Sequence, residues 1–468
     1  MNAHRTIAAP VLALATAIPL VAQQDLVTRA GAIHQRVITL DTHNDIDPAN
    51  FTPECNYTMR LSTQVNLPKM KEGGMDVSFM IVYVGQEAPP QAPDAFQPSG
   101  YERAYKLALA KFDAVHRLTE QIAPRDIELA LTPADVVRIA GAGKKVAVIG
   151  IENGYPLGTD LGRVKEFWER GGRYMSLAHN GHNQLADSHT GEAANEWRWG
   201  GLSPLGRQVI AEMNKWGIMV DISHPSKGSM MQAIGFSKAP VIASHSGIRR
   251  LANTSRNLDD EQLMAIKTNG GVVQVVGLSA FVKPDPPERA PAIAALRQEF
   301  GLTGGSSTAL GAGGRGGRGA AAAAPSVRAC PVEQPPTASP LPIGRASSAG
   351  PSTDLNALPP DRRAEFDRRM AEIDRKWPAA PRATVKDFVD EIDYAIKLIG
   401  IDHVGISSDF DGGGGIDGWN SAAESFNVTL ELVRRGYTEE QIGKIWSGNL
   451  LRVWGEVERV AKQIQAAR

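Results

Sequence analysis

The chain has 468 residues, 42% of them hydrophobic, which is enough for one large domain or two smaller ones. Its formal net charge is -1, so neither a nucleic acid nor an anionic membrane surface is expected as a partner. This balance favours a small substrate that is recognised locally.

The first 22 residues are predicted to be a signal peptide. Residues 6–22 are apolar and uncharged after a short polar start, and Gln23-Gln24-Asp25 follows, so cleavage is expected just after Ala22. The apolar run is too short and too rich in alanine for a typical membrane span, although an uncleaved anchor is the alternative. We therefore expect a periplasmic or secreted protein with no membrane span after cleavage.

Eight short apolar runs, most of them rich in Val and Ile, are predicted to be strands. They are Val37–Leu40, Val77–Val84, Val146–Ile151, Tyr174–Leu177, Ile218–Ile222, Val241–Ala243, Val272–Val276 and Val404–Ile406. Most precede a segment of helical periodicity, such as Arg207–Trp216 and Val385–Ile399. Strands that alternate with helices predict a parallel sheet, and eight of them predict a TIM (β/α)8 barrel over residues 23–468.

The barrel pattern is interrupted at about residues 302–360. This stretch is rich in Gly, Ala, Pro and Ser, and it cannot bury enough apolar surface to offset its chain entropy. We predict a disordered insertion between the seventh strand and the helices before the eighth. Cys55 and Cys330 could pair in an oxidising compartment, but Cys330 lies in this insertion, so the sequence leaves the pairing open. Two cysteines at this spacing exclude a Cys-based zinc finger.

Polar residues gather at the C-terminal ends of the predicted strands, which is the face where barrels build active sites. His43 and Asp45 follow the first strand and are two residues apart in an extended segment, so their side chains point the same way. Glu152 follows the third strand, where a carboxylate would be costly to bury unless it is paired or bound to metal. Later strands end similarly, in His179, His224, His245 and Asp409. Imidazole and carboxylate ligands favour zinc, with manganese or iron as alternatives.

Other polar residues near these positions have structural interpretations. His182 and His189 are interpreted as loop residues close to His179, and His403 as a structural residue at the start of a strand. Asp411 is expected to fix a glycine-rich turn, and Asp221 to orient a neighbouring ligand.

These segments, in this order and together with Trp446–Trp454, resemble the membrane dipeptidase (renal dipeptidase) family of metallopeptidases. The resemblance covers about residues 30–300 and 380–460. It implies a barrel that holds two zinc ions per chain. The implied ligands are His43 and Asp45 on one ion, His224 and His245 on the other, and Glu152 bridging both.

The resemblance also implies that the protein is a dipeptidase. Members of the family accept D-residues at the second position, and we expect the same of this chain. His179 is expected to contact the substrate and stabilise the oxyanion, and Arg256 to hold the substrate carboxylate. Two zinc ions that share Glu152 would lower the pKa of a bridging water, whose hydroxide would attack the peptide carbonyl. Asp409 would take the proton and pass it to the leaving amine. Members of the family are often dimers, so a homodimer is a further expectation.

Two other functions stay open on the sequence alone. A related metal amidohydrolase on the same barrel could act on a lactone, a cyclic amide or a phosphoester. Such enzymes often carry a His-x-His pair and a carbamylated Lys, whereas this chain has His43-Asn44-Asp45 and no Lys at a predicted strand end. A barrel that only binds a ligand should have lost a metal ligand or Asp409, yet every expected position is filled.

Overall fold

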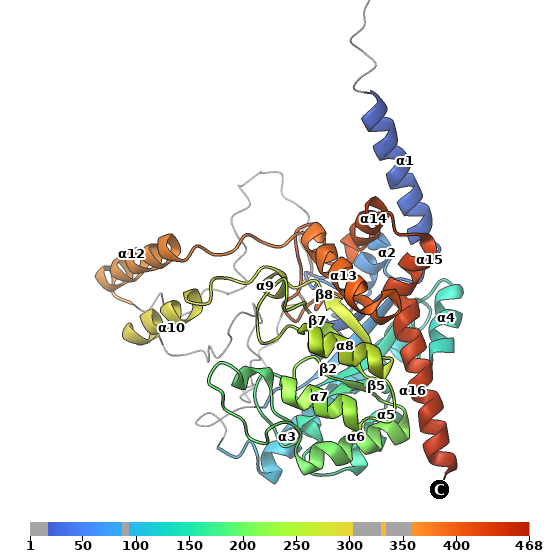
Figure 1. Cartoon of the computed structure of the whole chain (residues 1–468), viewed down its shortest axis with the longest axis horizontal. Helices are drawn as coiled ribbons and strands as arrows, with labels where there is room; N and C mark the ends of the chain where they lie inside the picture. The colour runs from blue at the N-terminus through green and yellow to red at the C-terminus, as the bar shows by residue number, and fades with distance from the viewer. Residues whose placement is uncertain (1–16, 87–92, 303–328, 334–354, 356–357, 468) are drawn as a thin grey trace, which may run out of the picture.

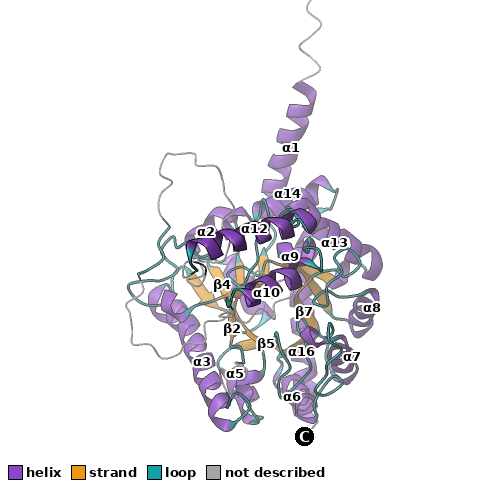
Figure 2. Cartoon of the chain, turned by 90° about the vertical axis from the view of Figure 1, so that its left-hand side faces the viewer, coloured by secondary structure: helices purple, strands orange, loops and turns teal. Residues whose placement is uncertain are grey.

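The computed structural model describes residues 17–86, 93–302, 329–333, 355 and 358–467. Eight parallel strands form a nearly closed barrel with helices around it (Figures 1 and 2). In barrel order they are β1 Leu40–Asp45, β2 Val77–Tyr83, β4 Lys145–Glu152, β5 Gly172–Ser176, β6 Met219–Asp221, β7 Ile242–Ser246, β8 Val272–Val276 and β9 Val404–Ser407. A parallel bridge between Asn44 and Phe410 joins the first strand to the segment that follows the last, with Asp45 N donating to Phe410 O at 2.9 Å. The predicted TIM barrel is confirmed.

Helices follow most of the strands, as the sequence pattern indicates. Their bounds are α1 Ala17–His34, α2 Leu67–Gly73, α3 Pro98–Arg117, α4 Pro133–Gly141, α5 Gly162–Glu169, α6 Pro204–Trp216, α7 Lys227–Phe236, α8 Asp260–Asn269, α9 Ser279–Val282, α10 Arg289–Glu299, α12 Pro360–Lys376, α13 Val385–Ile399, α14 Phe426–Arg434, α15 Glu439–Gly443 and α16 Asn449–Ala466. Helix α13 begins at a capping box of Thr384 and Asp387, which satisfies backbone N–H groups that the first turn leaves free. Among the described residues, no helix combines the length and the apolar character that a membrane crossing requires.

The barrel interior is closed at the end opposite the C-terminal edges of the strands. Alternate strand residues, including Val77 and Phe79 of β2, form one buried cluster with Val453 and Trp454 of α16. Because side chains alternate along a strand, the intervening residues, such as Met80, pack outward against the helices. The apolar plug leaves the opposite end of the barrel, where the strands end, for polar side chains.

The structure corrects two expectations about the strands. The first strand was expected at Val37–Leu40, but β1 begins at Leu40 and continues through His43 to Asp45. The residues after Leu40 are polar, so the apolar pattern used to predict strands stopped there. The strand continues because the barrel mouth buries these polar residues. A short strand, β3 Ile127–Leu129, was missed; it pairs with the start of β4 beside the barrel path.

The insertion expected at about 302–360 lies mostly outside the described residues. Its flanking helices, α10 and α12, pack on each other and extend from the barrel at the left of Figure 1. They share a small apolar cluster that includes Phe300 and Phe366. Residues 329–333 lie along the segment after β1, where Cys330 forms a disulfide with Cys55. The pairing that the sequence left open is therefore made, across a separation of 275 residues.

The signal peptide expected over residues 1–22 falls partly outside the described residues, which begin inside it. Helix α1 starts at Ala17, runs through the expected cleavage point after Ala22, and packs against α14. It leads away from the barrel at the top of Figure 1. The cleavage site stays a prediction.

Candidate metal centre and active site

Residues from separate strands converge on the carboxylate of Glu152 at the C-terminal end of the barrel. Oε1 of Glu152 lies 2.9 Å from His224 Nε2, 3.4 Å from His245 Nε2 and 3.7 Å from His179 Nε2. Oε2 lies 3.5 Å from His43 Nε2. The two oxygens of one carboxylate thus face different imidazoles, as a bridging ligand would require.

Asp45 and Asp409 complete this cluster. Among the described residues, three sets of possible ligand atoms lie within 4.8 Å of one another, and Glu152 belongs to two of them. The sets are His43–Asp45–Glu152, Glu152–His179–His224 and His43–His245–Asp409. The seven side chains that the sequence placed at strand ends are therefore brought together in one site.

The imidazoles are oriented so that Nε2 faces the centre of the site while Nδ1 is held from behind. His43 Nδ1 lies 2.9 Å from the hydroxyl of Tyr174, and His245 Nδ1 lies 2.8 Å from Ser244 Oγ. His224 Nδ1 lies 3.2 Å from the side-chain oxygen of Asn180. A partner on Nδ1 fixes the ring orientation, an arrangement that is typical of metal-binding histidines.

Two observations show that these residues fit divalent cations. His43 Nε2 is buried and has no hydrogen-bond partner among the described residues. His224 Nε2 and His245 Nε2 lie 2.9 Å apart, so two nitrogens point at the same space. Buried nitrogens that face each other and a carboxylate need a proton or a cation between them. Imidazole and carboxylate donors suit zinc or a related transition metal.

Carboxylates are also crowded at this site. A Cβ on Gly412 would lie 2.3 Å from Asp45 Oδ2 and 2.5 Å from Asp409 Oδ1, so glycine at this position lets both carboxylates approach. Burial raises the pKa of Asp409 to about 8, and the charges of Asp45 and Glu152 act in the same direction. His43 and a buried arginine oppose this rise without cancelling it. Bound cations would relieve the repulsion among the three carboxylates.

Arg256 is buried beside the imidazoles rather than exposed at the rim. Its Nη1 donates to Ser223 O and, at 3.0 Å, to Ser246 Oγ, and its Nη2 donates to His245 O at 2.7 Å. These bonds use three of the five N–H groups of the guanidinium. The Nε–H is buried and has no partner among the described residues. Arg256 therefore holds the backbone near two histidines of the site and keeps donors for a ligand.

The residues that the sequence assigned to structural roles have such contacts. Asp411 accepts hydrogen bonds from the backbone of Gln64 and Val65, so it fixes the turn as expected. Asp221 accepts from Ser244 Oγ at 2.7 Å, and that hydroxyl lies against His245 Nδ1, which confirms an orienting role.

The three histidines that the sequence assigned to loop or structural roles are also held by protein groups. His403 Nδ1 donates to Gly271 O at 2.8 Å. His182 accepts from Ser188 N, and His189 lies between Ser255 Oγ and the side chain of Asn180, both at 3.0 Å. Of these three, His189 lies beside the site, because its partner Asn180 also contacts His224.

Sequence reasoning missed the residues behind the imidazoles. Tyr174 and Tyr83 belong to predicted strands but were assigned no role. Tyr83 ends β2 in register with Glu152, and its hydroxyl lies 3.2 Å from His179 Nδ1. A tyrosine at the C-terminal end of a barrel strand is a usable signal, because that end faces the site.

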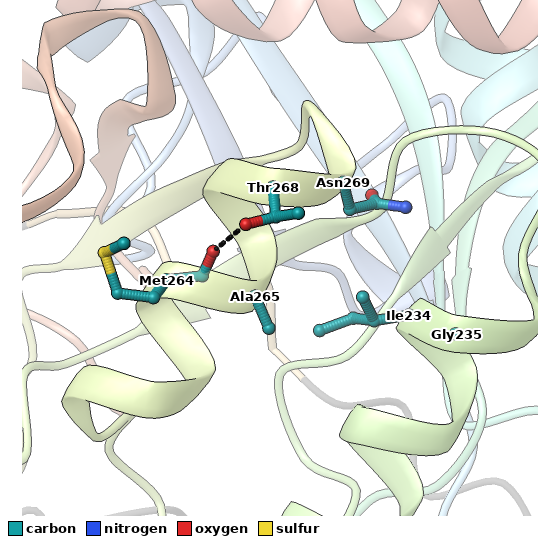
Figure 3. Close-up of a pocket in the computed structure, with 6 residues that line it drawn as sticks. All are labelled: Ile234, Gly235, Met264, Ala265, Thr268 and Asn269. Atoms are coloured by element: carbon teal, nitrogen blue, oxygen red, sulfur yellow. Dashed lines mark hydrogen bonds between the residues drawn. The ribbon is translucent and has the colours of Figure 1, made fainter.

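A separate hollow of about 420 Å³ lies between α7 and α8 in the outer helical layer (Figure 3). It is lined by Ile234, Gly235, Met264, Ala265, Thr268 and Asn269. None of these side chains titrates near neutral pH, so the hollow offers no acid, base or metal ligand. The chemistry belongs to the barrel mouth.

Barrel and site together define a metal-dependent hydrolase. The model of the family Membrane dipeptidase (Peptidase family M19) matches residues 27–468, and the chain belongs to this family. Dipeptidase aclJ of Aspergillus oryzae is 27% identical, over 92% of this chain and 80% of that protein. Dipeptidase tcpJ of Claviceps purpurea is 26% identical, over 86% of this chain and 72% of that protein.

Solved structures agree with this assignment. The probable dipeptidase PvdM from Pseudomonas aeruginosa is 31% identical, with a TM-score of 0.71 over 94% of this chain and 100% of that one. A metallo peptidase from Rhodobacter sphaeroides, liganded with a phosphinate mimic of L-Ala-D-Ala, is 20% identical and shares the fold, with a TM-score of 0.59 over 90% of this chain and 99% of that one. The chain is thus a metal-dependent dipeptidase, which confirms the expected activity over the two alternatives.

Proposed function

We propose that this dipeptidase uses two zinc ions per chain and accepts dipeptides with either an L- or a D-residue at the second position. The observation that carries the proposal is that the two oxygens of Glu152 face different imidazoles. His43 and Asp45 would hold one ion with Glu152, while His224 and His245 would hold the other. The bound ions would supply hydroxide at neutral pH and would polarise the peptide carbonyl.

His179 is suited to stabilise the oxyanion that forms on the carbonyl. The Tyr83 hydroxyl, 3.2 Å away, can donate to His179 Nδ1. Burial and nearby carboxylates raise the pKa of Tyr83, so the hydroxyl keeps its proton. A neutral His179 that accepts at Nδ1 carries its proton on Nε2, which faces Glu152 and the centre of the site. This donor would be aimed at the developing charge.

Asp409 is suited to move the proton. Its Oδ1 lies 3.8 Å from His43 Nε2, inside the cluster, and its pKa is raised to about 8 by burial and by its carboxylate neighbours. A buried carboxylate at this place is positioned to take and release a proton during turnover. Asp409 would take the proton released at the start of the reaction and deliver it to the leaving amine.

Arg256 would select dipeptides by holding the C-terminal carboxylate. Its Nε–H, which has no partner within the described part of the chain, and one remaining Nη2–H would bind the carboxylate, while its other donors fix the guanidinium in place. A clamp at a set distance from the metals places the scissile bond one residue from the free carboxylate. The ligand of the Rhodobacter sphaeroides structure supports extending the proposal to a D-residue at the second position.

Metal analysis together with a dipeptide library tests this proposal. We expect two zinc ions per chain, hydrolysis of dipeptides with L- and D-residues at the second position, and loss of activity in His224→Ala. His116→Ala is the matched control, because His116 lies on α3, where its ring nitrogens bond Glu120 and the carbonyl of Arg170. One ion per chain, or turnover of lactones and esters without turnover of dipeptides, would contradict the proposal.

We also propose that the protein works in the periplasm or outside the cell. The N-terminal apolar segment and the Cys55–Cys330 disulfide support this location, because disulfides persist in oxidising compartments. Cell fractionation with N-terminal sequencing should find the mature chain outside the cytoplasm, starting at Gln23. A full-length chain in the cytoplasm would contradict it.

We further propose that the protein forms a homodimer. Light scattering tests this, and a particle mass of one chain would contradict it.

A further inference from the structure

The loop after β9 holds Asp409 in an unusual backbone conformation. Asp409 has φ 59° and Asp411 has φ 61°, the left-handed region that residues with a side chain rarely adopt. Two of the four described non-glycine residues with positive φ therefore lie within three positions of each other. Such conformations persist where the surrounding structure holds them in place.

Gln64, which lies between β1 and α2, makes three contacts with this loop from one side chain. Its Oε1 accepts from Asp411 N at 2.7 Å, and its Nε2 donates to Gly414 O at 2.9 Å and to Asn420 O at 2.8 Å. Its backbone N also donates to Asp411 Oδ1 at 2.9 Å. Both hydrogens of the side-chain amide and its oxygen are used on this loop.

These contacts reach Asp409 through one further residue. Gly414 N donates to Asp409 O at 2.7 Å, and Gly412 N donates to the same oxygen at 3.2 Å. Gln64 thus holds Gly414 by a hydrogen bond to its carbonyl, and the N–H of Gly414 holds the carbonyl of Asp409. The side-chain amide of Gln64 bonds backbone groups of this loop, and these partners lie outside the imidazoles and carboxylates of the metal cluster.

We infer that Gln64 is a positioning residue that sets the place of the Asp409 carboxylate for proton transfer. This inference rests on the proposed function, in which Asp409 moves the proton. Proton transfer requires hydrogen-bond distances, so a small displacement of the loop lowers turnover. His224 follows β6, His245 lies on β7 and Arg256 follows β7, so we expect substrate binding to change little when the loop after β9 moves.

Gln64→Met removes all three side-chain hydrogen bonds at similar volume. We expect kcat to fall about 10- to 100-fold, as for an active-site group displaced by about 1 Å, with KM changed by less than about threefold and zinc content unchanged. Gln262→Met is the matched control. Gln262 is a buried glutamine on α8 that bonds Met230 Sδ and Asp259 N, so its loss should lower stability and leave kcat near the wild-type value.

A double-mutant cycle separates positioning from general loosening of the fold. If Gln64 acts through Asp409, then Gln64→Met in an Asp409→Asn background should lower the residual kcat no further. A wild-type kcat in Gln64→Met, or a loss that multiplies with that of Asp409→Asn, overturns the inference and leaves the proposed function intact. A wild-type enzyme that binds zinc but hydrolyses no dipeptide overturns both.

Discussion

Replacing Tyr174 by Phe should weaken zinc binding without touching a metal ligand. Tyr174 is buried on β5, and its hydroxyl donates to Thr42 O at 3.1 Å. Because a phenol has one hydrogen, the same oxygen is left to accept the Nδ1–H of His43 at 2.9 Å. That bond places the proton of the neutral imidazole on Nδ1 and leaves the lone pair of Nε2 facing Glu152. Tyr174 therefore selects the tautomer of His43 that can bind a cation.

The size of the effect follows from the loss of this one hydrogen bond to a metal-binding imidazole. Loss of such a partner typically lowers metal affinity by about 10- to 100-fold, which is about 1.4 to 2.8 kcal/mol at about 1.4 kcal/mol per tenfold. Competition with a chromophoric chelator measures the affinity directly. Tyr105→Phe is the matched control, because its hydroxyl bonds Glu166 on the outer helices. Equal zinc affinity in Tyr174→Phe and the wild type would refute the reasoning.

Four further outcomes are expected. Gly150→Ala should weaken zinc binding as Tyr174→Phe does, because a Cβ at Gly150 would lie 2.4 Å from Cζ of Tyr174 and would displace its ring. An unchanged affinity in the chelator competition would show that the position of this ring does not affect zinc binding. Burial raises the pKa of Glu391 on α13, so the folded chain keeps a proton that the unfolded chain releases, and stability falls as pH rises above the unfolded pKa. Urea unfolding between pH 5.5 and 7.5 should show a loss that is steeper in the wild type than in Glu391→Gln, by up to about 1.4 kcal/mol per pH unit; parallel curves would contradict it. Replacing Cys55 and Cys330 by Ser should lower the free energy of unfolding by about 2 to 4 kcal/mol, and an unchanged urea midpoint would mean that the crosslink is not stabilising. Dialysis against a chelator should abolish dipeptide hydrolysis and added zinc should restore it, whereas activity that survives complete metal removal would disprove metal dependence.

Most of the barrel and the convergence of the polar side chains at its mouth could be predicted from local sequence. Buried strands such as β2 and β8 are apolar runs interrupted by one polar residue each, and the apolar stripe of α13 has helical spacing. In a barrel of parallel strands, the residue that follows each run necessarily faces the same rim. Side chains as distant as His43 and Asp409 could therefore be assigned to one site before any contact between them was known.

Contacts between distant segments depended on the tertiary structure. The extension of β1 to Asp45 needs the barrel mouth to bury its polar residues, and the bond between Cys55 and Cys330 needs residues 329–333 to lie along the segment after β1. Tyr174 behind His43 and Gln64 under the Asp409 loop are likewise invisible to periodicity. Alternation and helical spacing report which way a side chain points within its own element. Which group it meets depends on the register and spacing of elements far away in the chain, and only the closed barrel sets these.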